Sequence, residues 1–249
     1  MLPILLETGS FVLYSYPLMF GLAWGVGYQI ILAYQEELKL SSLQIYLLLL
    51  TMFTSSWIGA KLFFLLTLPS SYRNELLPEF SFWMGGGLVF LGGLIFGLVA
   101  FLIWKKLTKF SFKHSFPMLL ALVWGHAIGR LGCLLAGCCY GSKTDLFWAI
   151  HLHGEDRHPT QAYEMILLII TAIILVIDYQ KAKNVLQSLF IYFVSYGIGR
   201  FLIEIFRGDE IRGQWGLFTP SQWVGLGMFG VGTLGLIHLY RQAKKLQNH

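Results

Sequence analysis

The sequence predicts an all-α integral membrane protein with about seven transmembrane helices, the N-terminus outside the cell and the C-terminus in the cytoplasm. Apolar residues make up 56% of the 249-residue chain. Charged residues make up 12%, about half the share of about 25% found in soluble globular proteins. Lys and Arg gather in alternate connections between long apolar stretches. These features exclude a soluble globular domain, a disordered chain and a nucleic-acid-binding protein.

The apolar stretches are each long enough to cross a bilayer, which takes about 20 mostly apolar residues. We expect helices at residues 11–34, 44–68, 80–104, 116–135, 162–178, 185–206 and 221–240. The first stretch is not a signal peptide, because no Lys or Arg precedes it and its apolar run is too long. Tandem repeats, low-complexity tracts and long linkers are absent, so we expect one polytopic membrane domain over residues 1–249.

The orientation follows from the distribution of Lys and Arg. With the N-terminus outside, cytoplasmic connections hold 10 of these 18 residues and outer segments hold 5. The remaining three, Lys61, Arg130 and Arg200, lie within predicted helices. Because Lys and Arg concentrate on the cytoplasmic side of membrane proteins, this distribution indicates an outer N-terminus and a cytoplasmic C-terminus.

A polar, histidine-rich segment at residues 148–160 separates the fourth and fifth stretches and is expected outside. His151 and His153 are two residues apart, a spacing that suits a strand better than a helix. No Cys or carboxylate pattern completes a standard metal site in this segment, so we expect a wet loop and no metal ion there.

Ionisable side chains within the predicted helices are unusual, because inserting each one costs about 2.5–3.5 kcal/mol. Arg200 and Glu204 are four residues apart and able to pair on one helix face, which Arg207 continues. A structural ion pair is one interpretation of Glu204. For Arg130 and Arg200, on separate helices, we favour a phosphate clamp, because Arg stays charged and donates bidentate hydrogen bonds. Lys61 lies within a stretch and Glu164 at the edge of one.

All three cysteines, Cys133, Cys138 and Cys139, lie in the segment GRLGCLLAGCCYG at residues 129–141. Three interpretations remain open. The thiols are packing residues, or one is a reactive thiolate whose pKa a nearby Arg130 lowers, or Cys133 forms a disulfide with Cys138 or Cys139.

Glycines are frequent in the helical stretches, and most of them predict close helix packing. G-x-x-x-G pairs occur at Gly21/Gly25, Gly93/Gly97 and Gly125/Gly129. The run Gly85, Gly86 and Gly87 also predicts a break in the third helix, because each glycine weakens a helix by about 1 kcal/mol relative to Ala.

Three motifs, taken together, resemble those of the prolipoprotein diacylglyceryl transferase family. The segment at 129–141 resembles the family signature G-R-x-G-N-F-x-N-G-E-x-x-G. RHPTQAYE at 157–164 is similar to RHPSQ-x-YE, and YGIGRFLIEIFR at 196–207 is similar to YG-x-x-RF-x-x-E-x-x-R. Weaker similarities occur at residues 16–20, 59–61, 86–93 and 220–222, in the order that the family has them.

The sequence also departs from the family pattern. Cys133 and Ala136 stand where the signature has asparagines, and Cys138 stands where it has glutamate. Leu91 occupies the position in the third helix where the family carries a functional histidine. A candidate base and several polar ligands are therefore missing, whereas both arginines are present.

The resemblance implies a multi-pass enzyme of the bacterial plasma membrane with its active site toward the outer face. It implies transfer of a diacylglyceryl group from phosphatidylglycerol to a cysteine thiol of a lipoprotein precursor, with release of glycerol phosphate and without a cofactor. Arg130 and Arg200 would hold the phosphate. His126, one helical turn before Arg130, His158 or a cysteine would replace the missing base. The catalytic candidates are Arg130, Arg200, His126, Cys133, Cys138 and Cys139, and the substrate-binding candidates are Tyr16, Lys61, Gly132, Gly141, His158, Gln161, Tyr196, Glu204 and Arg207.

Two other functions remain open. In the first, a family-like lipid site uses the cysteines as a nucleophile or redox pair toward another acceptor. In the second, the chain is a non-catalytic membrane transporter, since broken helices and charges near the bilayer midplane are typical of transporters. The two halves of the sequence show no inverted repeat, which argues against the transporter.

The orientation makes a direct prediction. A topology reporter fused at Lys109 should be active only on the cytoplasmic side, and one fused at Glu155 only on the outer side, because basic residues concentrate inside. A reporter at Lys109 that is active on the outer side would contradict this orientation.

Overall fold

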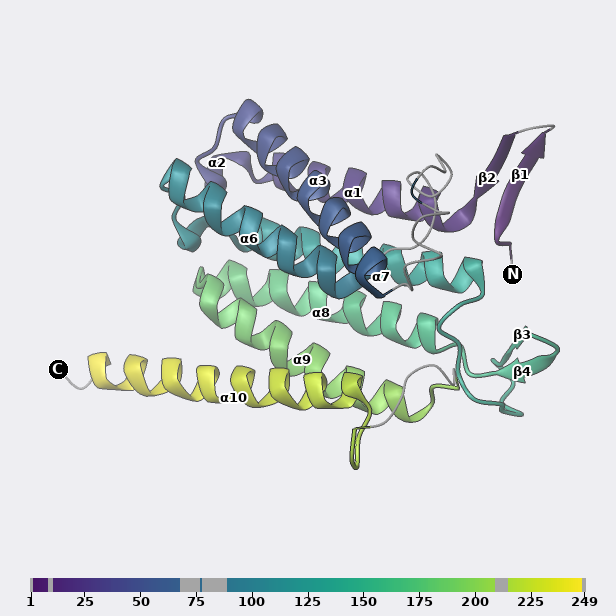
Figure 1. The fold of residues 1–249 in the computed structure, drawn as a ribbon. Helices are drawn as coiled ribbons and strands as arrows, with labels where there is room; N and C mark the ends of the chain where they lie inside the picture. The colour runs from purple at the N-terminus through teal and green to yellow at the C-terminus, as the bar shows by residue number, and fades with distance from the viewer. Residues whose placement is uncertain (1, 9–10, 68–76, 78–88, 209–214, 248–249) are drawn as a thin grey trace. The chain divides into compact units, whose positions relative to one another are not determined.

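The computed structural model describes residues 2–8, 11–67, 77, 89–208 and 215–247 (Figure 1). The chain divides into two compact units. Unit 1 comprises Met1–Tyr34 and Lys113–His249, and unit 2 comprises Gln35–Phe112.

Unit 1 is a row of helices with a β-hairpin at each of two places along the chain. Helix α1 packs on α7, α7 on α8, α8 on α9 and α9 on α10, so the first helix of the chain, which begins at Ser15, lies beside one that begins only at Phe116. The helices are α1 Ser15–Ala33, α7 Phe116–Ala136, α8 Thr160–Ala182, α9 Val185–Ile205 and α10 Pro220–Gln247. The hairpins are β1 Ile4–Thr8 with β2 Phe11–Tyr14, and β3 Ile150–Leu152 with β4 Glu155–Arg157. Both hairpins lie at one end of unit 1, and the C-terminal end of α10 lies at the other (Figure 1).

Unit 2 is a helical hairpin built from two long helices. It contains α2 Gln35–Leu38, α3 Ser42–Thr67 and α6 Phe90–Thr108, and a short 3-10 helix at Phe112–His114 leads out of it. The backbones of α3 and α6 touch where Gly59 meets Gly92, since a Cβ on either glycine would overlap the carbonyl oxygen of the other. Small residues therefore set this helix crossing, as is common between membrane helices.

The described residues contain six helices of 19 to 27 residues that are long and apolar enough to cross a membrane: α1, α3, α7, α8, α9 and α10. Together with α6, they overlap the seven predicted stretches, and the chain is a multi-pass membrane protein. Many side chains on their outer surfaces are large, apolar and exposed, as on Ile170 and Ile174 of α8, so they suit contact with lipid.

Two details of the predicted helices differ from the structure. The first helix does not begin at Phe11, because residues 11–14 pair with β1 and the helix starts at Ser15. An apolar run predicts burial but does not by itself separate strand from helix. The predicted break at Gly85–Gly87 lies outside the described residues.

The strand spacing of the histidines at residues 148–160 is partly confirmed. His151 lies on β3, whereas His153 lies in the turn before β4 with a φ of 53°. The segment is therefore a folded hairpin rather than an unstructured loop.

Close packing explains only some of the predicted glycine pairs. A Cβ on Gly97 would overlap the Ser56 hydroxyl, and one on Gly93 would lie 3.2 Å from the Ser56 carbonyl oxygen. Gly21, Gly25 and Gly129 have no described atom within 4 Å of an added Cβ, so tight packing at their pairs is wrong. The close contact between α9 and α10 instead depends on Gly197, whose Cβ would lie 2.6 Å from the Gly225 carbonyl oxygen.

Gly197→Ala should lower the free energy of unfolding by about 1–3 kcal/mol, because its Cβ would push two backbones apart. Gly227→Ala is the matched control, since no described atom lies within 4 Å of its Cβ. The control should be neutral, or stabilising by up to about 1 kcal/mol. Thermal unfolding in detergent measures both. Equal effects would show that the α9–α10 contact is not close in the folded protein.

Candidate active site

A buried carboxylate, Glu164, occupies the second turn of α8 at the end of unit 1 that carries the hairpins. The start of α8 is fixed by two side chains that are each 1% exposed. Thr160 donates from its hydroxyl to the Cys139 carbonyl at 3.0 Å, and Gln161 donates from Nε2 to the Cys138 carbonyl at 2.6 Å. The polar first turn of α8 therefore anchors the chain that follows α7.

Glu164 joins the helices on both sides of α8. Its Oε1 lies 2.9 Å from Nη2 of Arg130 on α7, and its Oε2 accepts from Nη1 of Arg200 on α9 at 3.3 Å. The Tyr196 hydroxyl donates to Oε1 at 2.7 Å, and Nε2 of His126 lies 3.5 Å from the same oxygen. The predicted proximity of His126 and Arg130 on one helix face is confirmed, since both reach a single carboxylate.

Arg200 extends the cluster to α10. Its Nη2 donates to the Ser221 hydroxyl at 3.0 Å and lies 2.8 Å from Oε2 of Glu204. The other Glu204 oxygen accepts from the Thr219 hydroxyl at 3.0 Å. The predicted pairing of Arg200 with Glu204 is therefore confirmed.

The cluster balances its charges and retains unused hydrogen-bonding capacity. Two guanidinium groups face two carboxylates, which offsets part of the cost of removing four charges from water. Arg130 Nε and Gln161 Oε1 are buried without a hydrogen-bond partner among the residues that the structure describes. Because most buried polar groups in folded proteins have a partner, two such atoms beside the ion pairs are an unusual feature of this cluster.

Aromatic side chains line the cluster. Tyr192 and Tyr196 stack with ring centroids 5.7 Å apart, and the His126 ring lies 5.2 Å from that of Tyr196. These contacts limit the freedom of the imidazole and the phenol, so both hold fixed positions beside Glu164.

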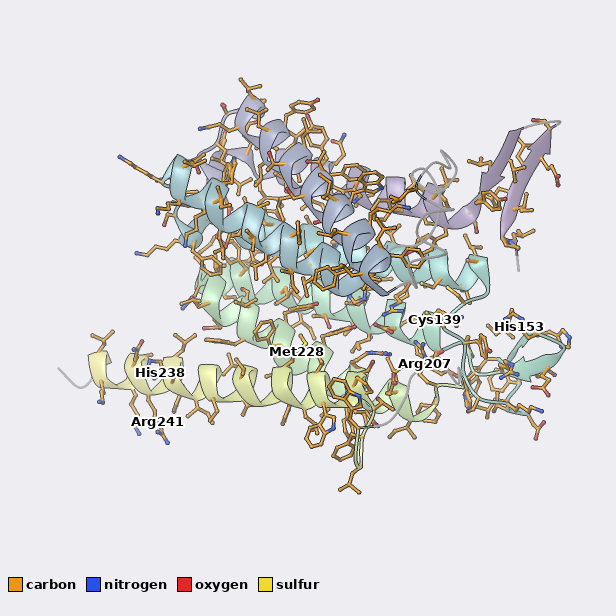
Figure 2. The ribbon with its side chains drawn as sticks, in the orientation of Figure 1. Cys139, His153, Arg207, Met228, His238 and Arg241 are labelled. Carbon is orange, nitrogen blue, oxygen red and sulfur yellow. The ribbon has the colours of Figure 1, made fainter. Side chains whose placement is uncertain are left out.

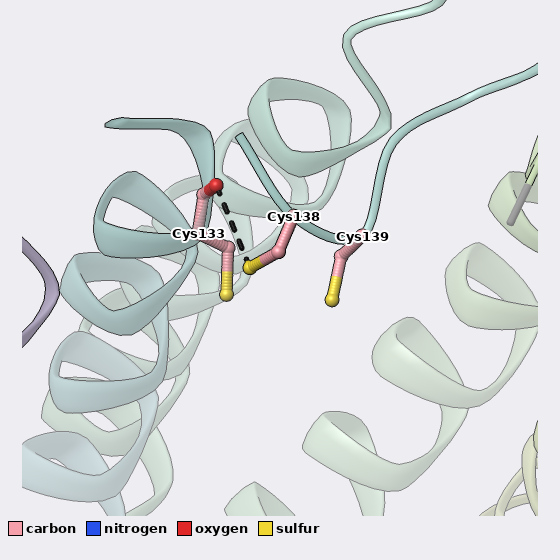
Figure 3. A group of neighbouring side chains, drawn as sticks. All are labelled: Cys133, Cys138 and Cys139. Atoms are coloured by element: carbon pink, nitrogen blue, oxygen red, sulfur yellow. Dashed lines mark hydrogen bonds between the residues drawn. The ribbon is translucent and has the colours of Figure 1, made fainter. Parts of the chain in front are cut away.

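The three cysteines converge at the end of α7 as free thiols (Figure 3). Their sulfur atoms all lie within 4.8 Å of one another. The neighbouring thiols of Cys133 and Cys138, together with Arg207 and Arg130, hold the pKa of the Cys139 thiol below its usual range by stabilising its thiolate. Figure 2 shows Cys139 and Arg207 at the same end of unit 1.

Tyr16 lies at the start of α1, close enough to Arg130 and the three cysteines to interact with them electrostatically. Gly132 permits this approach, since its Cβ would lie 3.3 Å from Cδ2 of Tyr16 and 3.0 Å from Cβ of Met19. Tyr16 is 43% exposed.

Gly141 and His158 support the chain around the cluster. A Cβ on Gly141 would overlap the backbone of His158, whose carbonyl accepts from the Gly141 N–H at 3.0 Å. The Nδ1 atom of His158 lies 3.2 Å from the Tyr163 hydroxyl. His158 is therefore engaged by Tyr163, whereas His126 is the histidine that touches Glu164.

Arg207 occupies a position that the sequence did not indicate, whereas Lys61 lies within a helix as predicted. Arg207 does not continue the helical stripe of Arg200, because α9 ends at Ile205 and Arg207 forms a backbone bridge with Gly141. Lys61 belongs to unit 2, where its side chain on α3 is 1% exposed.

Glu164 and Thr219 belong to the cluster but were not among the predicted site residues, and Ser221 was noted only within the weak family similarity at residues 220–222. The signal for Glu164 was present, because two arginines within apolar helices need a buried counter-charge. Glu164 ends the motif RHPTQAYE, which lies between the helices that carry those arginines.

Glu164→Gln should lower the free energy of unfolding by about 3–5 kcal/mol, because it leaves Arg130 without a carboxylate partner among the described residues and Arg200 with Glu204 alone. Asp156→Asn is the matched control, since Asp156 is exposed and pairs only at the surface with His151 at 2.9 Å. The control should leave the unfolding midpoint unchanged. A Glu164→Gln protein as stable as the wild type would show that the carboxylate is not the centre of the cluster.

Residues 3–238 match the model of the family described as prolipoprotein diacylglyceryl transferase. A phosphatidylglycerol–prolipoprotein diacylglyceryl transferase of Clostridioides difficile is 32% identical over 194 residues, covering 77% of this chain and 75% of that protein. The enzyme of the same name from Acaryochloris marina is 30% identical over 200 residues, covering 75% and 72%. That of Thermosynechococcus vestitus is 27% identical over 257 positions, covering 97% and 94%. The chain belongs to the prolipoprotein diacylglyceryl transferase family.

Proposed function

We propose that this protein transfers a diacylglyceryl group from phosphatidylglycerol to a cysteine thiol of a lipoprotein precursor. The family and the named relatives supply the reaction. The observation that carries the proposal is the pair Arg130 and Arg200, held from two helices on the buried carboxylate of Glu164. Paired guanidinium groups beside a lipid-facing helix suit recognition of a phospholipid phosphate.

The reaction breaks the bond between the glyceryl carbon and the phosphate oxygen. The acceptor sulfur forms a bond to that carbon, and the electron pair of the broken bond stays on the phosphate of the released glycerol phosphate. Negative charge therefore grows on the leaving oxygen, where fixed cations lower the barrier most effectively. We assign this role to Arg130 and Arg200, which Glu164 holds from two helices.

Glu164 acts as a positioning residue for the clamp. A guanidinium group has five N–H donors, and Glu164 engages Nη2 of Arg130 and Nη1 of Arg200. The Nε donor of Arg130 is then available to a phosphate oxygen. The carboxylate also orients both guanidinium groups, so the two arginines need to move little when lipid binds.

His126 is the candidate to accept the proton of the acceptor thiol. Its Nε2 lies 3.5 Å from Oε1 of Glu164, and a neighbouring carboxylate orients a histidine for proton transfer. The Tyr16 hydroxyl is a candidate to bind the lipid headgroup, and that of Tyr196 to orient Glu164.

The orientation of the site toward the outer face is part of the proposal. Within unit 1, the connection from α8 to α9 and the end of α10 lie away from the hairpins and carry Lys181, Lys183, Arg241, Lys244 and Lys245. The cluster lies near the opposite, hairpin end. Basic residues on the cytoplasmic side thus support an outward-facing site, and phospholipid would reach it laterally.

Arg130→Ala and Arg200→Ala should each lower the rate of diacylglyceryl transfer at least about 100-fold, the usual loss when one fixed donor to a developing anion is removed. Lys at either position should rescue poorly, because an ammonium does not reproduce the guanidinium fork. Transfer from phosphatidylglycerol to a lipobox peptide, measured by mass spectrometry on purified protein in vesicles, provides the rates.

Arg241→Ala is the matched control, because Arg241 is exposed near the end of α10 (Figure 2). It should transfer at the wild-type rate. Near-normal transfer by both Arg130→Ala and Arg200→Ala would make the arginines purely structural.

A further inference from the structure

The thiol cluster of Cys133, Cys138 and Cys139 is unexplained by packing. Cys138 is exposed and Cys139 is half-buried, so the burial of small apolar side chains does not account for all three. The chain has only these cysteines. We infer that they form a trithiolate zinc site, whose open fourth position takes the thiol of the acceptor protein.

The end of α7 builds the first half of the site. Gly137 adopts a φ of 74° and its N–H donates to Leu134, while the N–H of Cys138 donates to the carbonyl of Cys133 at 3.1 Å. This is a Schellman motif, in which the side chains at the positions of Cys133 and Cys138 come into contact. A spacing of five residues, poor for a helix face, thereby brings two thiols together.

The backbone of Cys139 adds the third thiol. Its φ of 60° is left-handed, a conformation that costs a non-glycine residue about 1–3 kcal/mol and persists only where its surroundings enforce it. The enforcing contacts are the hydrogen bonds from Gln161 and Thr160 to the carbonyls of Cys138 and Cys139. As a result, all three sulfur atoms point to the same side (Figure 3).

The geometry and the donor set fit zinc. Zinc–sulfur bonds of about 2.3 Å place thiolates on one ion about 3.8 Å apart. The three sulfur atoms already lie within 4.8 Å of one another, so side-chain rotations that move them by about 1 Å bring them to the spacing of zinc ligands. Three protein ligands with an open fourth position are the arrangement of catalytic zinc. Three thiolates and Zn²⁺ leave one net negative charge, which Arg130 and Arg207 offset from close by.

This inference rests on the proposed function for its chemical role. A thiol that coordinated zinc would lose its proton more readily, with His126 as the candidate acceptor, and the metal would hold the resulting thiolate beside Arg130. Its sulfur lone pair then forms the bond to the glyceryl carbon as the carbon–oxygen bond breaks toward the phosphate. The metal would supply the thiol activation for which this chain lacks the histidine of its family, since Leu91 stands there.

The test begins with metal content. Full-length protein is purified in detergent under reducing conditions, incubated with ZnCl₂ and desalted. It should then retain about one zinc ion per chain, as measured by inductively coupled plasma mass spectrometry. Cys133→Ser, Cys138→Ser and Cys139→Ser should each lose it. His151→Ala is the control and should keep it, because His151 is exposed and pairs with Asp156.

A second measurement does not depend on variants that fold poorly. Wild-type protein loaded with Co²⁺ should show thiolate-to-cobalt charge-transfer bands and the visible bands of a tetrahedral site. A peptide with a lipobox cysteine should shift these bands, and the same peptide with serine should not.

Metal-free wild-type protein with three titratable thiols, or with a disulfide among them, would overturn the zinc site. Transfer at full rate by protein stripped of metal would overturn its catalytic role, as would a lipid adduct on one of its own cysteines. Transfer without zinc leaves the proposed function standing, whereas stoichiometric zinc without transfer counts against the proposed function alone.

Discussion

The carboxylate of Glu164 is the group on which the arrangement of α7, α8 and α9 depends. A membrane interior does not tolerate isolated charges, so neither Arg130 nor Arg200 is stable there without a partner. Glu164, 1% exposed, gives one oxygen to each. The three helices must therefore pack in the register that brings these groups together, and Tyr196 and His126 close around the same carboxylate.

The proposed reaction makes opposite demands on its two reactants, and candidate groups for both lie on adjacent turns of one helix. The leaving phosphate needs fixed positive charge, for which Arg130 on α7 is the candidate. The acceptor thiol needs to lose a proton, and the thiol cluster begins one turn later at Cys133. Tyr16 from α1 and the first turn of α8 reach the same region. A ligand that spans both parts would bring its phosphate and the acceptor sulfur together.

Hydropathy predicts the helices well, because every span must be long and apolar whatever it packs against. Pairings within one helix, such as Arg200 with Glu204, are predictable from spacing alone. The role of Glu164 is not, since periodicity does not say which helix a charged face meets. Arg207 leaves its helix because the chain there pairs with Gly141, a partner far away in sequence.

The β1–β2 hairpin and the cysteine cluster show a different limit. Residues 11–14 are as apolar as the start of a membrane helix, so their composition does not distinguish a strand from a helix. The convergence of Cys133 with Cys138 and Cys139 depends on two left-handed residues, Gly137 and Cys139. The left-handed conformation of Gly137 is predictable, because glycine adopts it readily. That of Cys139 is not predictable from the residue type, because cysteine rarely adopts this conformation.

The most direct measurement of the central claim is transfer by the purified wild-type protein. The protein is placed in vesicles containing phosphatidylglycerol and given a lipobox peptide with a single cysteine. The account predicts a peptide carrying one diacylglyceryl group on that cysteine and an equal amount of released glycerol phosphate. An unmodified peptide, under conditions in which the Clostridioides difficile relative modifies it, would contradict the account.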